Sequence, residues 1–322
     1  MNAVMTQHPP KSPLSGRPPE LVRDLPEALL RKSLEDYFQE PPPARAVEGD
    51  YSLWRCVETH FEFAWPPRAG SEAFYQWIGG FPFYYPGTRW EHREVADRLR
   101  AESAGRTDGF KVLDVGCGSG RFLSSLNFLP IKARHAVDFS PLAIRECEAK
   151  GLPSHCGSIE SALGAGFVAM QSLDAVTSFH CLEHVEQPVQ FVEQMLSLLK
   201  PGGSLWVSTP NSPMSFESEW FDVLNHPPHH LGRWNPTAYR ALARRLGCEC
   251  DLFSPSASPL RFALGAFKLV SYGPNRGVGR VKRLADLVVG VGRFAGIWRR
   301  QRRRVAAAGV LAGDAILVRL TK

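Results

Sequence analysis

The chain lacks three features that would assign it to a membrane or to the secretory pathway. No run of about 18 apolar residues occurs in its 322 residues, so we expect no membrane-spanning helix. The amino-terminal residues contain no apolar segment of a secretory signal. The seven cysteines are scattered and odd in number, which is not typical of a disulfide framework. These absences favour a protein of the reducing cytoplasm.

Acidic residues are nearly missing from one segment, residues 261–304. It contains twelve Lys and Arg residues against one acid, Asp286, a local charge of +11 in a chain whose net charge is +6. Two interpretations of this amphipathic segment are open. It either makes peripheral contact with an anionic lipid surface, such as the inner membrane surface, or packs on the protein with a solvated arginine run. RNA binding is a third interpretation, but no nucleic-acid module surrounds the segment, so nucleic acid is not the expected partner.

Proline is concentrated near the amino terminus. Nine of the 26 prolines lie in residues 1–45, and we expect the first 18 residues to be disordered. Leucines recur at helical spacing from Leu21 to Leu34, which predicts a helix over residues 20–39, although Pro26 falls inside it. We therefore treat residues 1–45 as a proline-rich, largely disordered segment with one helix.

Short apolar runs then alternate with amphipathic helical patterns. The predicted strands are residues 111–115, 134–139, 173–179, 204–209, 248–253 and 314–320. The predicted helices are residues 121–128, 141–150, 189–199 and 236–246, the third of which ends at Lys200-Pro201-Gly202-Gly203. Such alternation predicts an α/β fold, a mostly parallel sheet with helices on both faces, in a domain of residues 106–322 with a basic insertion at 255–310.

A glycine-rich turn follows the first predicted strand, in the sequence KVLDVGCGSGRF (residues 111–122). A dinucleotide turn requires G-x-G-x-x-G to bind a pyrophosphate, whereas here the glycines are Gly116, Gly118 and Gly120, one residue short at the end. Asp114 stands two residues before the first glycine, where a carboxylate repels phosphate and suits a cationic ligand. The turn therefore favours a ligand that carries an amine and no phosphate.

A second acid, Asp138, ends the next predicted strand, 24 residues after Asp114. A carboxylate at this place can accept hydrogen bonds from both hydroxyls of a ribose. A nucleoside with an ammonium group and no phosphate describes S-adenosyl-L-methionine, which we predict as the cofactor.

Four sequence motifs, VLDVGCGSG, VDFSPLAI, LEHVEQP and LKPGGSLWVSTPN, resemble the class I S-adenosylmethionine-dependent methyltransferases. They are most similar to the small-molecule branch that includes ubiquinone-pathway and glycan-modifying enzymes. The resemblance implies a Rossmann-like sheet of seven strands whose last strand, residues 314–320, is antiparallel. It also implies that Asp114 and the turn hold the methionine end, that Asp138 holds the ribose, and that residues 156–160 approach the adenine. The expected cofactor-binding residues are Asp114, Gly116, Cys117, Gly118, Gly120, Asp138, Phe139, Ser158, Ile159 and His180.

The sequence SFHCLEHVEQP places His180, Glu183 and His184 after the strand 173–179, where one helical turn would gather them on one face. Some quinone O-methyltransferases carry acid-x-x-Glu-His at the comparable site and bind a divalent cation there, but here His180 replaces the first acid. Two imidazoles and a carboxylate would suit zinc or iron better than magnesium. We predict no metal, and a structural or proton-handling role for the three residues.

A second group of histidines lies in NHPPHHLGRWN, residues 225–235. In the resembling group, a loop here closes over the acceptor, and a histidine near neutrality can take the proton of an acceptor hydroxyl. We predict His184 as the first candidate for this base and His229 or His230 as the second, with His180 and Glu183 beside them. The alternative is a loop whose histidines cap backbone groups or lie in solvent.

The flank at residues 46–105 is predicted to form an aromatic, partly helical lid. Residues 51–67 resemble a degenerate zinc ribbon, but the single Cys56 cannot hold a tetrahedral zinc ion. The dense aromatic sequence that follows offers Tyr84, Tyr85 and Trp90 as pocket residues, with simple core packing as the alternative.

The sequence thus predicts an S-adenosylmethionine-dependent methyltransferase. We expect O-methylation of a small-molecule or lipid-linked acceptor, either a glycan or a quinone-like hydroxyl. The alternatives are a non-catalytic cofactor-binding protein that acts through its basic segment, and an RNA methyltransferase.

Overall fold

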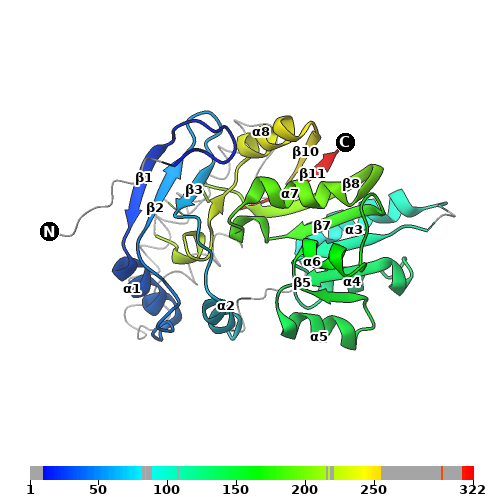
Figure 1. Cartoon of the computed structure of the whole chain (residues 1–322), viewed down its shortest axis with the longest axis horizontal. Coiled ribbons are helices and arrows are strands. Elements are labelled where there is room, and N and C mark those ends of the chain that lie inside the picture. The colour runs from blue at the N-terminus through cyan, green and yellow to red at the C-terminus, as the bar shows by residue number, and fades with distance from the viewer. Residues whose placement is uncertain are drawn as a thin grey trace.

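The computed structural model describes residues 10–81, 84, 89–106, 109–214, 217, 221–254, 299 and 314–322 (Figure 1). Two β-sheets organise this part of the chain, a four-stranded sheet near the amino terminus and a seven-stranded sheet beyond it. No helix in the described ranges is long and apolar enough to cross a bilayer. Apart from residue 299, the basic segment 261–304 falls outside the described residues, so both interpretations of it remain predictions.

The seven-stranded sheet has the strand order β10-β11-β8-β7-β4-β5-β6. Its members are β4 (Val112–Val115), β5 (Arg134–Asp138), β6 (Ser154–Cys156), β7 (Leu173–Phe179), β8 (Leu199–Pro210), β10 (Glu249–Phe253) and β11 (Ala315–Thr321). Every adjacent pair from β8 to β6 is parallel, and β11 is inserted antiparallel between β8 and β10. This confirms the predicted Rossmann-like sheet with an antiparallel last strand.

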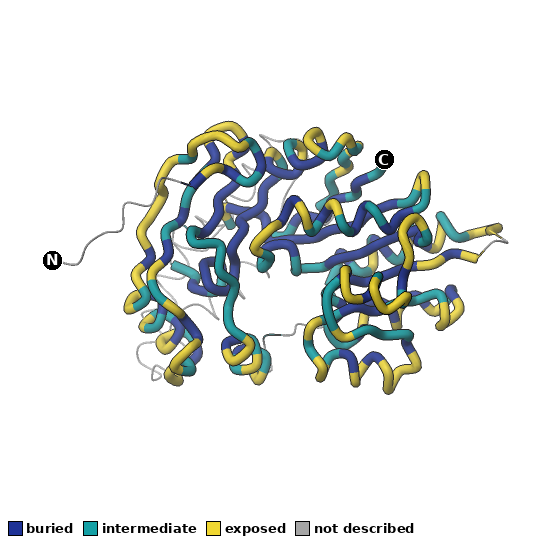
Figure 2. Tube along the Cα trace, viewed as in Figure 1, coloured by how far each residue is buried: buried dark blue, intermediate teal, exposed yellow. Residues whose placement is uncertain are grey.

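Helices cover both faces of this sheet. They are α3 (Trp90–Ser103), α4 (Arg121–Ser125), α5 (Pro141–Ala149), α6 (Ile159–Gly164), α7 (Pro188–Ser197) and α8 (Pro236–Leu246). Neighbouring residues of β4 point to opposite faces, so Val112 belongs to a core with α3, α4 and α5, whereas Leu113 belongs to a core with α6, α7 and α8. Because both faces are covered, the central strands β4, β7 and β8 are mostly buried, whereas the edge strands β6 and β10 are partly exposed (Figure 2).

The second sheet is antiparallel and has the order β1-β2-β3-β9. Its strands are β1 (Glu20–Leu25), β2 (Tyr51–Arg55), β3 (Glu62–Trp65) and β9 (Gly232–Arg233), and α1 (Glu27–Phe38) and α2 (Glu72–Gly79) pack beside it. Strand β9 comes from the loop that follows β8. The amino-terminal half of the molecule is therefore completed by a segment about 170 residues later, as the pairing of Glu62 with Arg233 shows.

The predicted helix over residues 20–39 is wrong in its first third. Residues Glu20–Leu25 form the edge strand β1, and the helix starts after Pro26, whose ring fixes the turn between them. The expectation of disorder through residue 18 is also wrong for the described residues 10–18. Leu14 is buried there, and Arg245 of α8 donates hydrogen bonds to the carbonyl oxygens of Pro13 and Leu14.

Two further boundaries differ from the prediction. Helix α7 ends at Ser197, and Lys200 to Gly203 lie in the first part of β8, where the register with β7 is shifted. The short strand β6 was not predicted, because three residues are too few to show a period-2 pattern.

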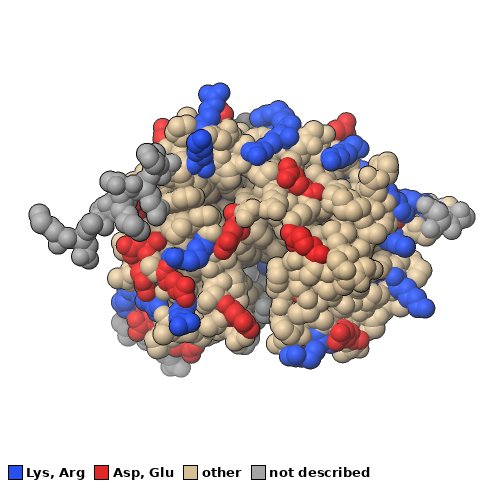
Figure 3. All heavy atoms as spheres, viewed as in Figure 1, with Lys and Arg blue, Asp and Glu red and all other residues tan. Residues whose placement is uncertain are grey.

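The surface that faces the viewer in Figure 3 carries scattered charges of both signs over the two halves, and it is hollowed where the halves meet. No basic patch gathers on this face among the described residues. By sequence, residues 261–304 carry a charge of +11 and the whole chain carries +6, so the rest of the chain carries the difference, −5.

Candidate active site

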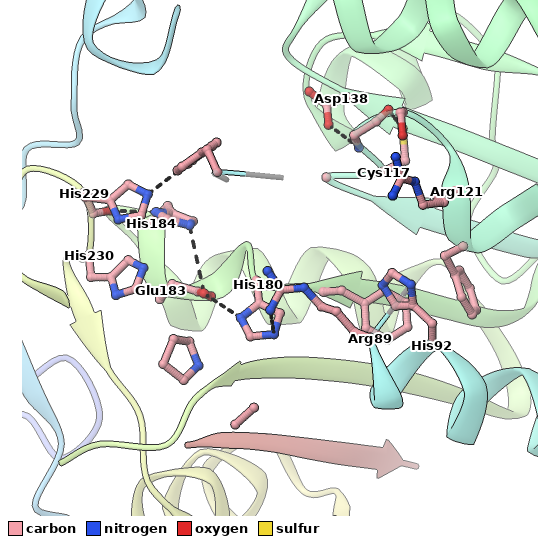
Figure 4. Close-up of a pocket in the computed structure, with 18 of the residues that line it drawn as sticks. Arg89, His92, Cys117, Arg121, Asp138, His180, Glu183, His184, His229 and His230 are labelled. Carbon is pink, nitrogen blue, oxygen red and sulfur yellow. Dashed lines mark hydrogen bonds and ion pairs between the residues drawn. The ribbon is translucent and has the colours of Figure 1, made fainter. Parts of the chain in front are cut away.

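One cavity of about 700 Å³ opens at the carboxyl ends of β4, β5 and β7. Its volume lies within the range of small-molecule and cofactor sites, and its place is the point where the strand order reverses, the usual ligand site of an open α/β sheet. Acids and the glycine turn line one end, and a group of histidines lines the other (Figure 4). Both sets of residues singled out from the sequence therefore reach the same cavity.

The path of the glycine turn is fixed by hydrogen bonds to β5 and by close packing against Cys181 and Cys147. The amides of Gly116 and Cys117 donate to the carbonyl oxygen of Val137, which ties the turn to β5. A side chain at Gly116 would lie 2.9 Å from the Cys181 sulfur, and one at Gly120 would lie 2.7 Å from that of Cys147. Both glycines also have positive φ, so the turn can take this path only without side chains at these positions.

Asp114, in β4, lines the cavity and is buried, with its Oδ1 accepting a 2.7 Å hydrogen bond from the Thr177 hydroxyl of β7. Burial raises the pKa of this carboxyl to about 8, which the Thr177 hydrogen bond only partly offsets. No cation of the described residues is paired with it. A ligand with a positive charge at this place would therefore stabilise the ionised carboxylate.

Asp138 ends β5 on the other side of the turn. Its two oxygens accept 2.8 Å hydrogen bonds from the amides of Ser140 and Gly118, and burial raises its pKa. These amides fix the carboxylate at the cavity wall and leave its remaining lone pairs free to face a ligand (Figure 4).

The other predicted cofactor residues divide into two groups. Gly116, Cys117, Gly118 and His180 line the cavity together with the two acids. Gly120, Phe139, Ser158 and Ile159 do not: Gly120 starts α4, Phe139 is exposed, Ser158 caps α6 and Ile159 is buried in the core. Their contacts with a bound cofactor remain predictions.

The turn after β7 brings His180, Glu183 and His184 together, as their spacing predicts. Glu183 is buried, and its Oε1 lies 3.3 Å from His180 Nδ1 and 4.0 Å from His184 Nε2. His180 has positive φ and is also bound by Glu91 Oε1, at 3.1 Å from Nε2. Although burial opposes it, the two carboxylates raise the pKa of His180 and stabilise its charged form.

The loop between β8 and α8 is fixed by a buried ion pair. Arg233 of β9 binds Glu62 of β3 at 2.8 Å and also pairs with Glu217. The amide of Leu231 donates to the carbonyl oxygen of Glu183, so the loop is joined to the turn after β7. These bonds place His229 and His230 against His184, although the residues lie more than 40 positions apart in the sequence (Figure 4).

Hydrogen bonds define which ring nitrogen donates a proton in each histidine at this end of the cavity. The Nδ1 atoms of His184 and His229 face the carbonyl oxygens of His229 and Leu224, and that of His230 faces Asn225 Oδ1. Since these oxygens only accept, each Nδ1 donates a proton to its partner, and in the neutral ring Nε2 is then the nitrogen with the lone pair. Burial also lowers the pKa of His229 and His230 well below the usual value, so these two rings are neutral at physiological pH.

Two arginines of the cavity were not predicted. Arg89, directly before α3, approaches His180 Nε2 at 2.9 Å, and Arg121 is the first residue of α4. Both line the cavity, Arg121 beside Cys117 of the glycine turn and Arg89 beside His180 (Figure 4). An arginine next to a glycine turn was the available signal for Arg121, since the carboxylate of an amino acid ligand requires a cation. Arg89 left no such signal in the sequence.

The predicted lid contributes to the same cavity. Tyr84 and Trp90 line it, and the Tyr84 hydroxyl donates to His229 Nε2 at 2.9 Å. Tyr85 lies outside the described residues. Cys56, in the hairpin of β2 and β3, is buried beside Ser15 and remote from the cavity lining.

Comparison with known families and curated proteins finds methyltransferases in both cases. The family model of a methyltransferase domain matches residues 88–252. A ubiquinone biosynthesis O-methyltransferase of Xanthomonas oryzae pv. oryzae is 36% identical over 112 residues, which are 34% of this chain and 46% of the relative. One of Cupriavidus pinatubonensis is 35% identical over 106 residues, 32% of this chain and 42% of the relative. The chain thus spans about half the length of the curated relatives it matches.

Among solved structures, a SAM-dependent methyltransferase from Archaeoglobus fulgidus is 18% identical, with a TM-score of 0.45 over 72% of this chain and 94% of its own. The plantazolicin methyltransferase BpumL in complex with SAH is 15% identical, with a TM-score of 0.44 over 72% of this chain and 82% of its own.

Proposed function

The chain belongs to the methyltransferase-domain family, as a class I S-adenosylmethionine-dependent member, and from this premise we propose that it methylates a hydroxyl oxygen of a small-molecule or lipid-linked acceptor. The observation that carries the proposal is that a cavity of about 700 Å³ joins the acids of the glycine turn to the histidines of two later loops. A methyl donor and an acceptor bound in one enclosure can meet without release of either.

The residues present fit S-adenosylmethionine. We propose that Asp114 receives the ammonium group, because its buried carboxyl has no other cation among the described residues. Arg121, at the first position of α4, would bind the carboxylate of the same methionine part. Asp138 would accept the ribose hydroxyls, since its orientation is already fixed by two backbone amides.

The transfer is a single displacement. When bound, the cofactor supplies a methyl group whose bond to sulfur breaks, with the electron pair left on sulfur, while an oxygen lone pair of the acceptor forms the new bond to carbon. The acceptor hydroxyl loses its proton in the same process, and the histidine end of the cavity is where this has to happen. We propose that His184 accepts this proton at Nε2, because its side chain is the least buried of the five candidates. Glu183, His180, His229 and His230 would position His184 and the acceptor around it.

The acceptor we propose is a quinone-like ring or a glycan that carries a free hydroxyl. The relatives with about 36% identity over the matched region are named for O-methylation in ubiquinone biosynthesis, which supports an oxygen acceptor. The aromatic side chains of Tyr37, Tyr84, Trp90 and Phe179 in the cavity lining would suit a planar ring.

The proposal is tested by methyl transfer from S-adenosylmethionine labelled with deuterium in the methyl group. The full chain is incubated with phenolic quinol precursors, with glycolipids and with RNA, and each product is analysed by mass spectrometry. We expect one labelled methyl group on a hydroxyl oxygen of a quinol or glycan. Label on nitrogen, on carbon or on RNA, or no transfer at all, contradicts the proposal.

Variants connect the activity to the site. Asp138→Asn should abolish cofactor binding, whereas Asp251→Asn, on an exposed residue of β10, should not change it. His184→Gln should retain cofactor binding and lower turnover by about 100-fold or more, as expected for loss of a group that assists proton removal.

A further inference from the structure

Three histidines converge at the acceptor end of the cavity: His184 after β7, and His229 and His230 in the loop before β9. Each offers one ring nitrogen, and these three nitrogens lie within 4.8 Å of one another. The ring centroids are 4.5 to 4.9 Å apart. Three nitrogens at such distances can move onto one ion by small rotations of the side chains.

The orientation of the three rings is already fixed by hydrogen bonds at their Nδ1 atoms. Each Nδ1 donates to an oxygen: the His229 carbonyl for His184 at 2.6 Å, the Leu224 carbonyl for His229 at 2.7 Å, and the Asn225 amide for His230 at 3.0 Å. Histidine ligands of metals are held in this way, with one nitrogen on a carbonyl or carboxylate oxygen and the other on the ion. The arrangement leaves all three Nε2 lone pairs as the available ligand atoms.

A carboxylate stands beside the three imidazoles. Glu183 Oε1 is 4.0 Å from His184 Nε2, and Glu183 Oε2 is buried without a hydrogen-bond partner among the described residues. An uncompensated oxygen on a side chain that is 1% exposed is rare in proteins and indicates that a group is still to be bound. Its negative charge would favour a cation rather than a neutral ligand.

From these contacts we propose that His184, His229 and His230 bind one divalent transition-metal ion through Nε2. A set of three imidazole ligands suits zinc, cobalt or iron(II) and does not suit magnesium, which prefers oxygen ligands. The inference departs from the sequence prediction of no metal, and its ligands differ from the set His180, Glu183 and His184 that the sequence offered, because both nitrogens of His180 are engaged by carboxylates.

The three ligands occupy one side of the ion and leave at least one coordination position toward the cavity. Water or a hydroxyl oxygen of the acceptor would fill it, so the ion would position the oxygen that receives the methyl group. With the ion on its Nε2, His184 would act as a ligand and not as the base, and the ion would lower the pKa of the bound hydroxyl so that its proton leaves to water. This role rests on the proposed function, whereas the binding of the ion does not. In the ligand-free chain the Tyr84 hydroxyl donates to His229 Nε2 and is the group that the ion must displace.

The experiment measures metal binding directly. The full chain is freed of metal with a chelator and titrated with Zn²⁺ by calorimetry and with Co²⁺ by visible absorption. We expect one ion per chain, with cobalt bands typical of nitrogen ligands in a low-coordinate site, and no competition from a large excess of Mg²⁺. Binding of no zinc, or of several ions of equal affinity, overturns the proposal.

Matched variants assign the ligands. His229→Gln and His230→Gln should each weaken zinc binding by more than about 100-fold, beyond the 10–100-fold cost of losing an outer-shell partner. His226→Gln is the control, since His226 is buried in the same loop but its nitrogens face Asp222 O and Arg233. The control should bind zinc within about threefold of the wild-type chain. Equal zinc affinity of all three variants overturns the proposal.

Binding of S-adenosylmethionine serves as the folding check for each variant. Loss of zinc affinity with cofactor affinity retained supports the ligand assignment. Zinc binding without any methyl transfer would support the metal site and contradict the proposed function. Methyl transfer by a chain that binds no zinc would support the proposed function and contradict the metal site.

Discussion

At the scale of single residues, Asp114 has the most consequential environment. Its carboxyl is buried at the cofactor end of the cavity, and burial raises its pKa to about 8. The free protein therefore holds this group mostly protonated at neutral pH, whereas an ammonium group beside it would favour the ionised form. Binding of a cationic ligand must then release a proton.

The affinity for S-adenosylmethionine should accordingly rise with pH, by up to about tenfold per unit, until the pH reaches the pKa of Asp114 near 8. Calorimetry in buffers of different ionisation enthalpy measures both the affinity and the proton released. Asp114→Asn should bind weakly and without this pH dependence. The range from pH 6 to pH 8 begins roughly two units below the pKa of Asp114 and ends at it. If the affinity of the wild-type chain stays constant over this range, Asp114 does not face the ammonium group.

Gly120 illustrates a second residue-scale requirement. A methyl group there would meet the Cys147 sulfur and the Leu152 Cδ1 at 2.7 Å, and φ is +68°. Gly247, at the end of α8, has φ of +66° and open space around it. Comparing the two positions separates crowding from backbone strain.

Gly120→Ala should destabilise the fold by roughly 1–3 kcal/mol more than Gly247→Ala, which carries only the backbone cost. Urea unfolding of both variants and the wild-type chain gives the difference in free energy of unfolding. An equal loss in free energy of unfolding at the two positions would mean that Cys147 and Leu152 move aside for the added methyl group without a measurable cost in stability.

At the scale of elements, the two-residue strand β9 connects the halves of the molecule. Arg233 in β9 and Glu62 in β3 form an ion pair in which both side chains are more than nine-tenths buried. Breaking a buried pair costs more than breaking an exposed pair, although here Arg233 would retain its second partner, Glu217.

Glu62→Gln should therefore destabilise the protein by about 2–3 kcal/mol, less than the roughly 3–5 kcal/mol of a buried charge left wholly unpaired, because Arg233 keeps its pair with Glu217. Asp36→Asn, which breaks the exposed pair with Lys32 in α1, should cost no more than about 1 kcal/mol. Thermal and urea denaturation measure both. Because β9 directly follows His229 and His230, Glu62→Gln should also weaken zinc binding, and an unchanged zinc affinity would show that the loop is held by other contacts.

Elements also show where local patterns mislead. Leu21 and Leu25 fit the helical spacing of the leucines that follow, yet they belong to β1, since Pro26 cannot donate the hydrogen bond that would continue a helix through it. The strand itself is defined by pairing with β2, a contact about 30 residues away, and no property of residues 20–25 alone indicates it.

At the scale of the whole molecule, cofactor binding should stabilise the fold, because the cavity is built from segments far apart in the chain. A ligand at 100 times its dissociation constant adds about 2.7 kcal/mol to the free energy of unfolding. S-adenosylmethionine and S-adenosylhomocysteine should both raise the melting temperature, and NADH should not.

Differential scanning calorimetry with the three ligands gives this comparison, and Asp138→Asn should lose the effect while Asp251→Asn retains it. Stabilisation by NADH instead of the nucleoside ligands would contradict the interpretation of the two acids, since a pyrophosphate would then occupy the glycine turn.

The sequence by itself determined six of the seven strands of the large sheet, the glycine turn and the places of Asp114 and Asp138. Strand and helix periods are local, and the carboxyl ends of parallel strands meet at one edge, so residues there become neighbours whatever else the chain does. Even the gathering of His180, Glu183 and His184 followed from spacing within one turn.

Only the tertiary structure decided which histidines meet across the cavity, that Arg89 reaches His180, and that β9 completes the amino-terminal sheet. These contacts join residues 45 to 171 positions apart. Nothing periodic in a sequence encodes such a pairing, because it depends on how two finished halves pack and on which buried charges and hydrogen bonds can be satisfied only when they do.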